Sequence, residues 1–326
     1  MADYKAIKGH TIQTVAGDPG TIVNGLIWYD SVAKKVQGSK LGTAAWTSGG
    51  NLNNGRYRGG GGGCGTRDAG LIFGGYSTAT GSYSAQVEQY NGTSWTEGPH
   101  ADYPSVTGDV GQCGTTTAAL GVGGNSPSFV DEVYHGDGSS WTAGGDYPSP
   151  TNRTSVAGIQ TAALGAGGAG SGYDQIISCF EYDGSSWTSG GNYTNIVANV
   201  GIAGTQTAAI AEGGYGPGGS DSNEAATYNG TAWTAITDTS TNRGEHGFST
   251  TGTTTDYMTF GSPANTEKWD GTSWTEIADV STARTSGFSV GTTSAAFYAG
   301  GNPGGITGTE EFDHSIAAVT FTSSKL

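Results

Sequence analysis

The sequence predicts an all-β protein, a β-propeller of six four-stranded blades with a short N-terminal extension; seven blades are the alternative. Two sequence patterns recur along the 326 residues, one ending in Trp and one ending in a pair of glycines. The chain has 60 glycines, yet its 8 Trp and 16 Tyr return at regular intervals. Because large aromatic side chains bury much area each, this recurrence predicts a folded repeat array rather than a disordered chain.

The first pattern runs from an aromatic residue through Asp or Asn, Gly and Ser or Thr to Trp. Its copies are YNGTSW at Trp95, YDGSSW at Trp187, YNGTAW at Trp233, WDGTSW at Trp274 and the longer YHGDGSSW at Trp141. With Trp46 included, successive Trp anchors lie 49, 46, 46, 46 and 41 residues apart. Such a period indicates one supersecondary unit for each repeat.

The second pattern precedes each Trp anchor and has six copies. They are CGTRDAGLIFGG from Cys64, CGTTTAALGVGG from Cys113, AGIQTAALGAGG from Ala157, AGTQTAAIAEGG from Ala203, TGTTTDYMTFGS from Thr251 and VGTTSAAFYAGG from Val290. Every copy has glycine in second place, and five end in a glycine pair. The alternation of small apolar and polar residues suits a half-buried strand. We expect four short strands in each unit, with the small-residue strand nearest the axis and the Trp strand farthest out, which is one propeller blade.

The Gly pair, the Tyr-Asp step and the Trp, in that order, resemble the kelch family over residues 46–315. The resemblance implies a propeller of four-stranded blades. Kelch units often carry an arginine before the first strand. The arginines that fall near this place are Arg56, Arg153, Arg243 and Arg284, and the second and fourth blades have none.

Ring closure is expected from the segment around Trp46, AAWTSGGNLN, which has a fourth-strand pattern without the three strands before it. The last unit has Ala317 where its Trp should stand, so we expect the Trp46 strand to complete the sixth blade. In the alternative, residues 316–322 complete that blade and the N-terminal hairpin stays outside or in a partial seventh. The predicted parts are an N-terminal attachment segment with a β-hairpin at 1–45, the propeller at 46–315 and a C-terminal strand or tail at 316–326.

Binding is expected on the loops between second and third strands, because these loops vary in length whereas turns such as YDGSS repeat. Variable loops on a rigid scaffold commonly bind ligands. Aromatic rings and short polar side chains suit sugars or protein partners, although Gly, Asn, Asp and Ser are also ordinary turn formers. The candidate ligand-binding residues, chosen where aromatic and acidic groups occur together, are Tyr76, Tyr83, Tyr173, Asp174, Tyr215 and Asp221.

Composition argues against several classes of function. A formal net charge of −15 with only 13 basic residues opposes binding to nucleic acid or to an anionic membrane. No stretch approaches the ~20 apolar residues of a membrane-spanning helix, and the first residues lack the pattern of a signal peptide. The three cysteines, Cys64, Cys113 and Cys179, suit neither a disulfide framework nor metal-pair spacing, and the 5 His form no zinc motif. We predict no metal site.

An enzyme is not expected. Galactose oxidase also uses a kelch-type propeller, but its copper site needs a set of Tyr, His and Cys for which this chain has no matching motif. Sialidase propellers carry an Asp-x-Gly-x-Thr-Trp motif, whose spacing differs from that of YDGSSW. The run RGGGGGCGT lacks the Gly-Lys-Ser/Thr ending of a phosphate loop. We therefore predict no catalytic residue and no cofactor.

As a whole, the chain resembles the Gly- and Thr-rich kelch-like structural proteins of tailed phages, particularly marine cyanophages. The resemblance lies in AAWTSGGNLNNGR, in the TAAL-x-x-GG strands, in the YDGSSWT turns and in GTIVNGLIWYDSVAKKVQ. It implies a virion component, a tail, fibre or capsid-surface protein made in the host cytoplasm. Residues 1–45 would attach to other virion structural proteins or form a homo-oligomer, and the propeller would contact a host glycan or receptor. A cellular kelch scaffold that binds a protein partner is the alternative, and a galactose-oxidase-like or sialidase-like enzyme is the third.

Overall fold

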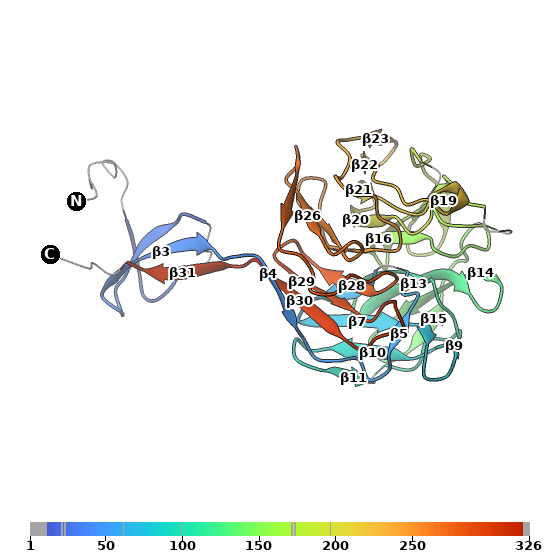
Figure 1. Cartoon of the computed structure of the whole chain (residues 1–326), viewed down its shortest axis with the longest axis horizontal. Helices are drawn as coiled ribbons and strands as arrows, with labels where there is room; N and C mark the ends of the chain where they lie inside the picture. Colours follow the sequence, from blue (N-terminus) through green and yellow to red (C-terminus); the bar gives the residue numbers. More distant parts are fainter. Residues whose placement is uncertain are drawn as a thin grey trace. The chain divides into compact units, whose positions relative to one another are not determined.

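Strands form almost all of the regular structure in this protein (Figure 1). The computed structural model describes residues 12–20, 22, 24–60, 62–98, 100–170, 172, 174–195 and 197–321. A short 3-10 helix, η3, spans Pro217–Gly219. Within the described residues, no helix combines the length and apolar character that crossing a bilayer requires. The all-β prediction is confirmed.

The chain divides into two compact units. The small unit joins the N-terminal segment up to Ala44 with the C-terminal segment from His314, and the large unit is the continuous stretch Ala45–Asp313. The boundaries expected from the sequence lie within two residues of the boundaries of these units. The C-terminal segment at 316–326, however, is not a separate region, because it belongs to the same unit as the N-terminal segment. It pairs with the N-terminal segment, a contact between chain ends that local sequence patterns do not show.

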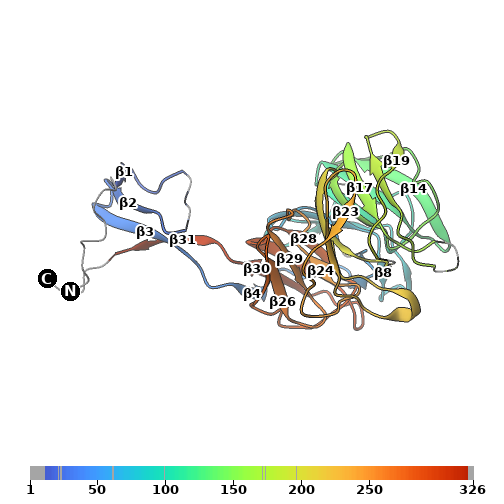
Figure 2. The same ribbon diagram turned by 90° about the horizontal axis from the view of Figure 1, so that it is seen from above.

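The small unit is a four-stranded sheet in the order β1 (Gln13–Val15), β2 (Ile27–Asp30), β3 (Lys35–Leu41) and β31 (Ile316–Thr320) (Figure 2). β2 and β3 form an antiparallel hairpin. The carboxylate of Asp30 closes its turn by accepting the backbone N–H groups of Val32 and Ala33 at 2.8 and 3.0 Å. These bonds, first among them that from Ala33, lower the pKa of Asp30.

In its described residues, the large unit contains six four-stranded antiparallel sheets, one for each copy of the repeat. The first is β6 (Cys64–Thr66), β7 (Ala69–Phe73), β10 (Val87–Tyr90) and β11 (Trp95–Glu97). The second is β12 (Gly111–Thr115), β13 (Ala118–Asn125), β14 (Phe129–Gly136) and β15 (Trp141–Ala143). The third is β16 (Ser155–Ile159), β17 (Ala162–Ala166), β18 (Cys179–Tyr182) and β19 (Trp187–Ser189).

The other three sheets repeat the same order of strands. The fourth is β20 (Gly201–Thr205), β21 (Ala208–Glu212), β22 (Ala225–Tyr228) and β23 (Trp233–Ala235). The fifth is β24 (Gly247–Phe248), β25 (Tyr257–Phe260), β26 (Thr266–Trp269) and β27 (Trp274–Ile277). The sixth is β28 (Phe288–Gly291), β29 (Ala295–Ala299), β30 (Thr309–Asp313) and β4 (Ala45–Ser48). A three-stranded sheet of β5 (Arg56–Tyr57), β8 (Tyr76–Ser77) and β9 (Ser82–Tyr83) accompanies them.

The conserved spacing of glycine within the repeat has a steric cause in the turn between first and second strands. Gly114 has φ +100°, and a Cβ atom there would lie far inside contact distance of the Ala118 carbonyl oxygen. Four other copies of the repeat have the same left-handed glycine. The fifth copy departs, because β24 ends at Phe248 and Gly252 does not have a left-handed φ. Only glycine adopts the tight turn without strain.

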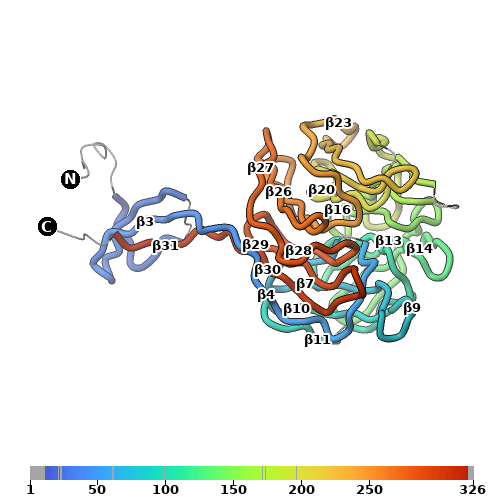
Figure 3. Tube along the Cα trace, in the orientation of Figure 1, coloured from blue at the N-terminus to red at the C-terminus, as the bar shows by residue number. Residues whose placement is uncertain are grey.

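The six sheets are arranged like the blades of a propeller. Each first strand contacts the first strand of the next sheet, and β28 contacts β6. In the sixth sheet β4, which comes from the start of the large unit, pairs with β30 near its end, with Trp46 opposite Phe312 (Figure 3). The alternative in which residues 316–322 complete this sheet is wrong, since β31 pairs with β3 in the small unit.

Aromatic side chains join each sheet to its neighbour. Trp141 packs edge-on against Phe73 of the preceding sheet, with ring centroids 4.8 Å apart, and its Nε1 donates to the Ala101 carbonyl at 3.0 Å. Tyr228 donates from its hydroxyl to Glu181 at 2.6 Å. Because such contacts recur from sheet to sheet, the repeated Trp and Tyr positions hold the large unit together.

Candidate functional site

The predicted ligand-binding residues fall into separate places on the large unit. Tyr76 and Tyr83 lie on neighbouring strands β8 and β9, with ring centroids 5.6 Å apart. Tyr215 is half-buried and forms a β-bridge with Asp221, which is exposed. Asp174 is also exposed, and Tyr173 lies outside the described residues.

Six residues with left-handed backbone, here called the collar, lie where the chain approaches the first strand of each sheet. Within the described part of the large unit, the non-glycine residues with left-handed φ, between 52° and 61°, are Arg58, Asp109, Arg153, Asn199, Glu245 and Ser286. This conformation costs a non-glycine residue roughly 1 kcal/mol or more. Its repetition in every sheet indicates that the surrounding structure imposes it.

Backbone hydrogen bonds connect the collar residues of successive sheets. The N–H of Asp109 donates to the Arg58 carbonyl at 2.8 Å, and the N–H of Arg153 donates to the Asp109 carbonyl at 3.0 Å. The N–H of Asn199 donates to the Arg153 carbonyl at 2.9 Å, and the same bond joins Ser286 to Glu245 at 2.6 Å. In these four residues, Asp109, Arg153, Asn199 and Ser286, the left-handed turn directs the N–H toward the preceding sheet, where it finds an acceptor.

The collar side chains form a continuous chain of charges. Asp109 lies 3.5 Å from the Arg58 guanidinium and 3.9 Å from that of Arg153. Arg153 also contacts Glu245 at 3.0 Å, and this ion pair joins the third sheet to the fifth without involving Asn199 of the fourth. Glu245 in turn accepts a hydrogen bond from Ser286. Burial raises the pKa of Asp109 to about 6, opposed by the charges of Arg153 and Arg58. Two guanidinium groups thus face two carboxyl groups at this end of the sheets.

Two of the predicted tyrosines pack against this collar. The Arg58 guanidinium lies 5.9 Å from the ring centre of Tyr83 and donates to its hydroxyl at 2.9 Å. Arg153 lies 5.9 Å from the ring centre of Tyr215. The collar and the variable loops therefore occupy the same end of the large unit. Half-buried aromatic rings beside fixed charged groups are suited to hydroxyl-rich ligands such as sugars.

Arg153 precedes a first strand as expected, but it does not share the repeat position of the other three arginines. Arg56, Arg243 and Arg284 share one position, and each is buried beside a carboxylate of the third strand of its sheet, namely Glu88, Glu267 and Glu310. Arg153 occurs two residues later in the repeat, in the collar. The sequence signal for the collar was its constant place, two residues before the first strand in five of the six sheets.

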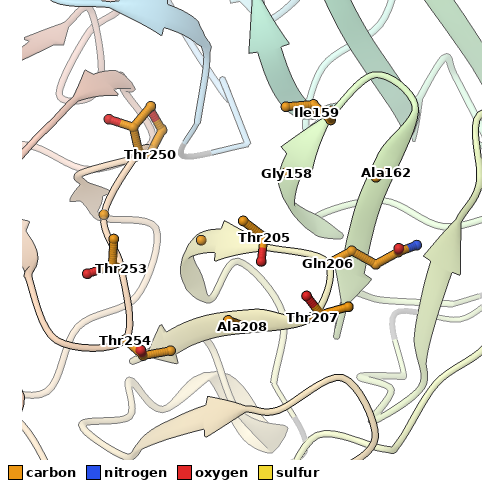
Figure 4. A pocket seen from close by; sticks show the side chains of 13 residues that line it. Gly158, Ile159, Ala162, Thr205, Gln206, Thr207, Ala208, Thr250, Thr253 and Thr254 are labelled. Atoms are coloured by element: carbon orange, nitrogen blue, oxygen red, sulfur yellow. The ribbon is translucent and has the colours of Figure 1, made fainter.

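At the other end of the first strands lies an open cavity of about 610 Å³. It is formed by turns of the third, fourth and fifth sheets, and its side chains include Ile159, Thr205, Gln206 and Thr253 (Figure 4). Gln206 is fixed because its amide donates to the Tyr182 carbonyl at 2.8 Å. The lining is mainly Gly, Ala and Thr, and it offers no charged group.

The cysteines are buried in the large unit as free thiols. Burial raises the pKa of Cys64 to about 12 and that of Cys179 to about 11, which keeps both protonated. Across the described residues, no three His, Cys, Asp or Glu side chains gather in a way that would hold a metal ion. No protein-family model matches the chain, and no curated protein matches its sequence.

Proposed function

We propose that this chain is a non-catalytic structural protein of a virus particle, a kelch-like propeller of six blades whose loop end binds a host glycan or receptor. The small unit, which includes most of the attachment segment at 1–45, holds the protein to its neighbours in the particle. The ring is closed by the β4 strand of Trp46. Support for closure comes from the pairing of β4 with β30 and from the contact of β28 with β6.

The observation that carries the proposal is the separation of charge between the two units. The segments of the small unit have six Lys and three Asp, a formal net charge of +3, whereas Ala45–Asp313 has seven Lys and Arg and 25 Asp and Glu, a formal net charge of −18. Acidic domains repel one another in solution. A basic small unit joined to an acidic large unit suits a protein that is attached to a particle through the small unit and displays the large unit.

The ligand at the loop end is a neutral glycan in this proposal. The field of a unit with net charge −18 disfavours sialylated or sulfated sugars. The two collar arginines do not offset this, because each already contacts a carboxylate. The Tyr83 and Tyr215 rings supply flat apolar surface for stacking on a sugar.

A glycan array with the purified full chain tests the binding role. We expect binding to neutral glycans and a loss of at least about tenfold in affinity for Tyr83→Ala, since stacked aromatic contacts are worth roughly 1–1.5 kcal/mol or more. Ile159→Ala, at the other end of the first strands, is the matched control and should bind normally. Equal glycan binding by both variants would refute the proposed binding role of the loop end.

Electron cryo-microscopy of the native assembly tests the attachment role. The proposal predicts that the small unit contacts other particle proteins and that the collar end faces outward. A free cellular protein bound through its loops to a protein partner would instead favour the kelch scaffold. An ordered small molecule with reacting groups in the 610 Å³ cavity would favour an enzyme.

A further inference from the structure

The open cavity at the end of the first strands lies where two copies of the repeat depart from the others. The left-handed glycine of the first turn is followed by threonine in four sheets, whereas the third sheet has Ile159 there, 56% exposed. The turn of the fifth sheet is two residues longer, because Gly247 pairs with Phe260, thirteen positions on, and the equivalent pair of the fourth sheet is eleven positions apart. Ile159 and residues 250–254 of the longer turn both line the cavity (Figure 4).

This cavity is preformed, because hydrogen bonds hold the longer turn to the sixth sheet. The Thr251 hydroxyl donates to the Gly291 carbonyl at 2.9 Å, and the Gly291 N–H donates to the Thr250 hydroxyl at 3.2 Å. The lining contains no charged group. A preformed hollow of about 610 Å³ with mainly aliphatic walls suits an apolar side chain, since its binding requires no rearrangement of the turns.

The turns around the cavity are acidic. Exposed aspartates in the turns of the third and fifth sheets are Asp183, Asp256 and Asp270. Lys268 offsets one of them, since it contacts Asp256 at 3.0 Å. Hydrogen bonds from backbone N–H groups of their own turns lower the pKa of the other two carboxyl groups, which keeps both ionised. Together with the net charge of −18 of the large unit, these carboxylates attract a basic partner.

The turn between β2 and β3 in the small unit has the complementary chemistry. Val32 lies at its tip and is 73% exposed, the most of any large apolar residue in the described part of the chain. Glycine and polar residues are usual in such turns, so turn formation does not explain an aliphatic side chain there. Asp30 fixes the turn by accepting the N–H groups of Val32 and Ala33, and the exposed Lys34 and Lys35 follow directly. The tip is therefore a fixed apolar point beside two positive charges.

We infer that the tip of one copy inserts Val32 into the cavity of another copy, beside Ile159, with its lysines facing the aspartates around the cavity. An aliphatic side chain then meets an uncharged apolar hollow, and a unit at +3 meets a unit at −18. Because tip and cavity are different surfaces of each copy, the contact is head-to-tail and repeats from copy to copy. One tip buries less than the ~800 Å² per partner of a standard interface, so a single contact is weak and the repeated contacts reinforce one another. The inference goes beyond the proposed function, which specifies no contact between copies.

Disulfide trapping between two single variants of the full chain tests the inference. After oxidation, an equimolar mixture of Val32→Cys and Ile159→Cys should contain a linked dimer with one chain of each kind. Its yield should be at least about tenfold higher than that from Val32→Cys mixed with Val106→Cys, the matched control at the other exposed apolar residue described in the large unit. The three native thiols are buried and do not compete. Equal yields from the two mixtures overturn the inference.

A double variant distinguishes a contact between copies from one within a single copy. Oxidised Val32→Cys/Ile159→Cys should form linked oligomers whose share falls on dilution, and a monomer with an internal disulfide overturns the inference.

A charge reversal tests the electrostatic part of the contact. Lys35→Glu in the Val32→Cys chain should lower the yield of linked dimer at least about fivefold, because the tip then repels the aspartates around the cavity. Lys40→Glu makes the same change of charge on β3 away from the tip and should leave the yield within about twofold. Equal losses from the two variants would show only a general attraction between the units, and would overturn the inference.

Discussion

Removal of one member of a buried Arg–Glu pair should destabilise the large unit far more than replacement of both members. In the fifth sheet, Arg243 Nη2 lies 3.1 Å from Glu267 Oε1, and the two side chains are 0% and 2% exposed. Two charges at this distance interact by roughly 5 kcal/mol at an effective dielectric constant of ~20. Arg243→Thr leaves Glu267 buried without its partner, so we expect the free energy of unfolding to fall by about 3–5 kcal/mol.

The chain itself supplies a neutral replacement for this pair. The two equivalent positions hold Thr151 and Phe180 in the third sheet, which has the same four strands. We therefore expect Arg243→Thr/Glu267→Phe to recover at least about 2 kcal/mol of the loss, because no uncompensated charge stays buried.

Guanidinium-induced unfolding, followed by tryptophan fluorescence, measures both variants against the original chain. The reasoning is refuted if Arg243→Thr lies within about 1 kcal/mol of the original chain, since the pair would then contribute little. It is also refuted if the double variant is no more stable than the single one. In that case the loss would come from packing of the Arg243 side chain and not from the charge left on Glu267.

Three further predictions concern the collar, the repeated glycine and the contacts between sheets. Burial raises the pKa of Asp109 from 3.8 to about 6, so ionisation of this carboxyl group opposes folding as the pH rises through this range. Relative to the original chain, Asp109→Asn should therefore raise the free energy of unfolding by up to ~3 kcal/mol above pH 6 and leave it unchanged below pH 3.8. Unfolding measured at several pH values checks this. Gly114→Ala should lower the free energy of unfolding in urea by more than about 2 kcal/mol, because the backbone carbonyl of Ala118 occupies the place of its Cβ atom. Gly98 also has a left-handed φ, +79°, but has open space around it, so Gly98→Ala should lose only ~1 kcal/mol. Equal losses would contradict the steric argument. Tyr228→Phe removes the hydrogen bond to the Glu181 carboxylate of the preceding sheet and should lower the free energy of unfolding by about 1–2 kcal/mol. Tyr193→Phe removes a buried hydroxyl that has no hydrogen-bond partner and should leave the stability unchanged. Thermal unfolding of the two variants in parallel checks this difference.

The fold could be predicted where a residue's role is local. The left-handed glycine of the first turn, present in five of the six copies, and the Trp of each fourth strand recur along the chain, and each shapes the strand beside it. The pairing of the Trp46 strand with β30 was also within reach, because that strand has a fourth-strand pattern and no preceding three. Tyr83 and Tyr215 were chosen as candidates because they lie on loops of variable length, and both rings lie beside collar arginines.

Other features depend on contacts between distant parts of the chain, and local sequence patterns did not lead to them. The pairing of β31 with β3 joins residues almost 280 positions apart, and Lys40 opposite Ala317 carries no pattern that indicates it. The collar was missed because its members differ in chemistry; only backbone conformation unites Arg58, Asn199 and Ser286. The sequence did not separate Arg153 from Arg56, Arg243 and Arg284, because a difference of two positions is small beside a repeat of about 46 residues.

The two connections between the units have a mechanical consequence. The chain leaves the sixth sheet through β4 and β30, whose residues Ala45 and Asp313 lie opposite each other, and it enters the small sheet through β3 and β31, whose residues Leu41 and Ile316 do the same. Tension applied to the small unit is thus divided between two neighbouring strands that are hydrogen-bonded to each other. Neither strand is peeled from the other, because both are pulled in the same direction. The hydrogen bonds between β4 and β30 therefore carry little of the load, and each connection bears only part of the pull.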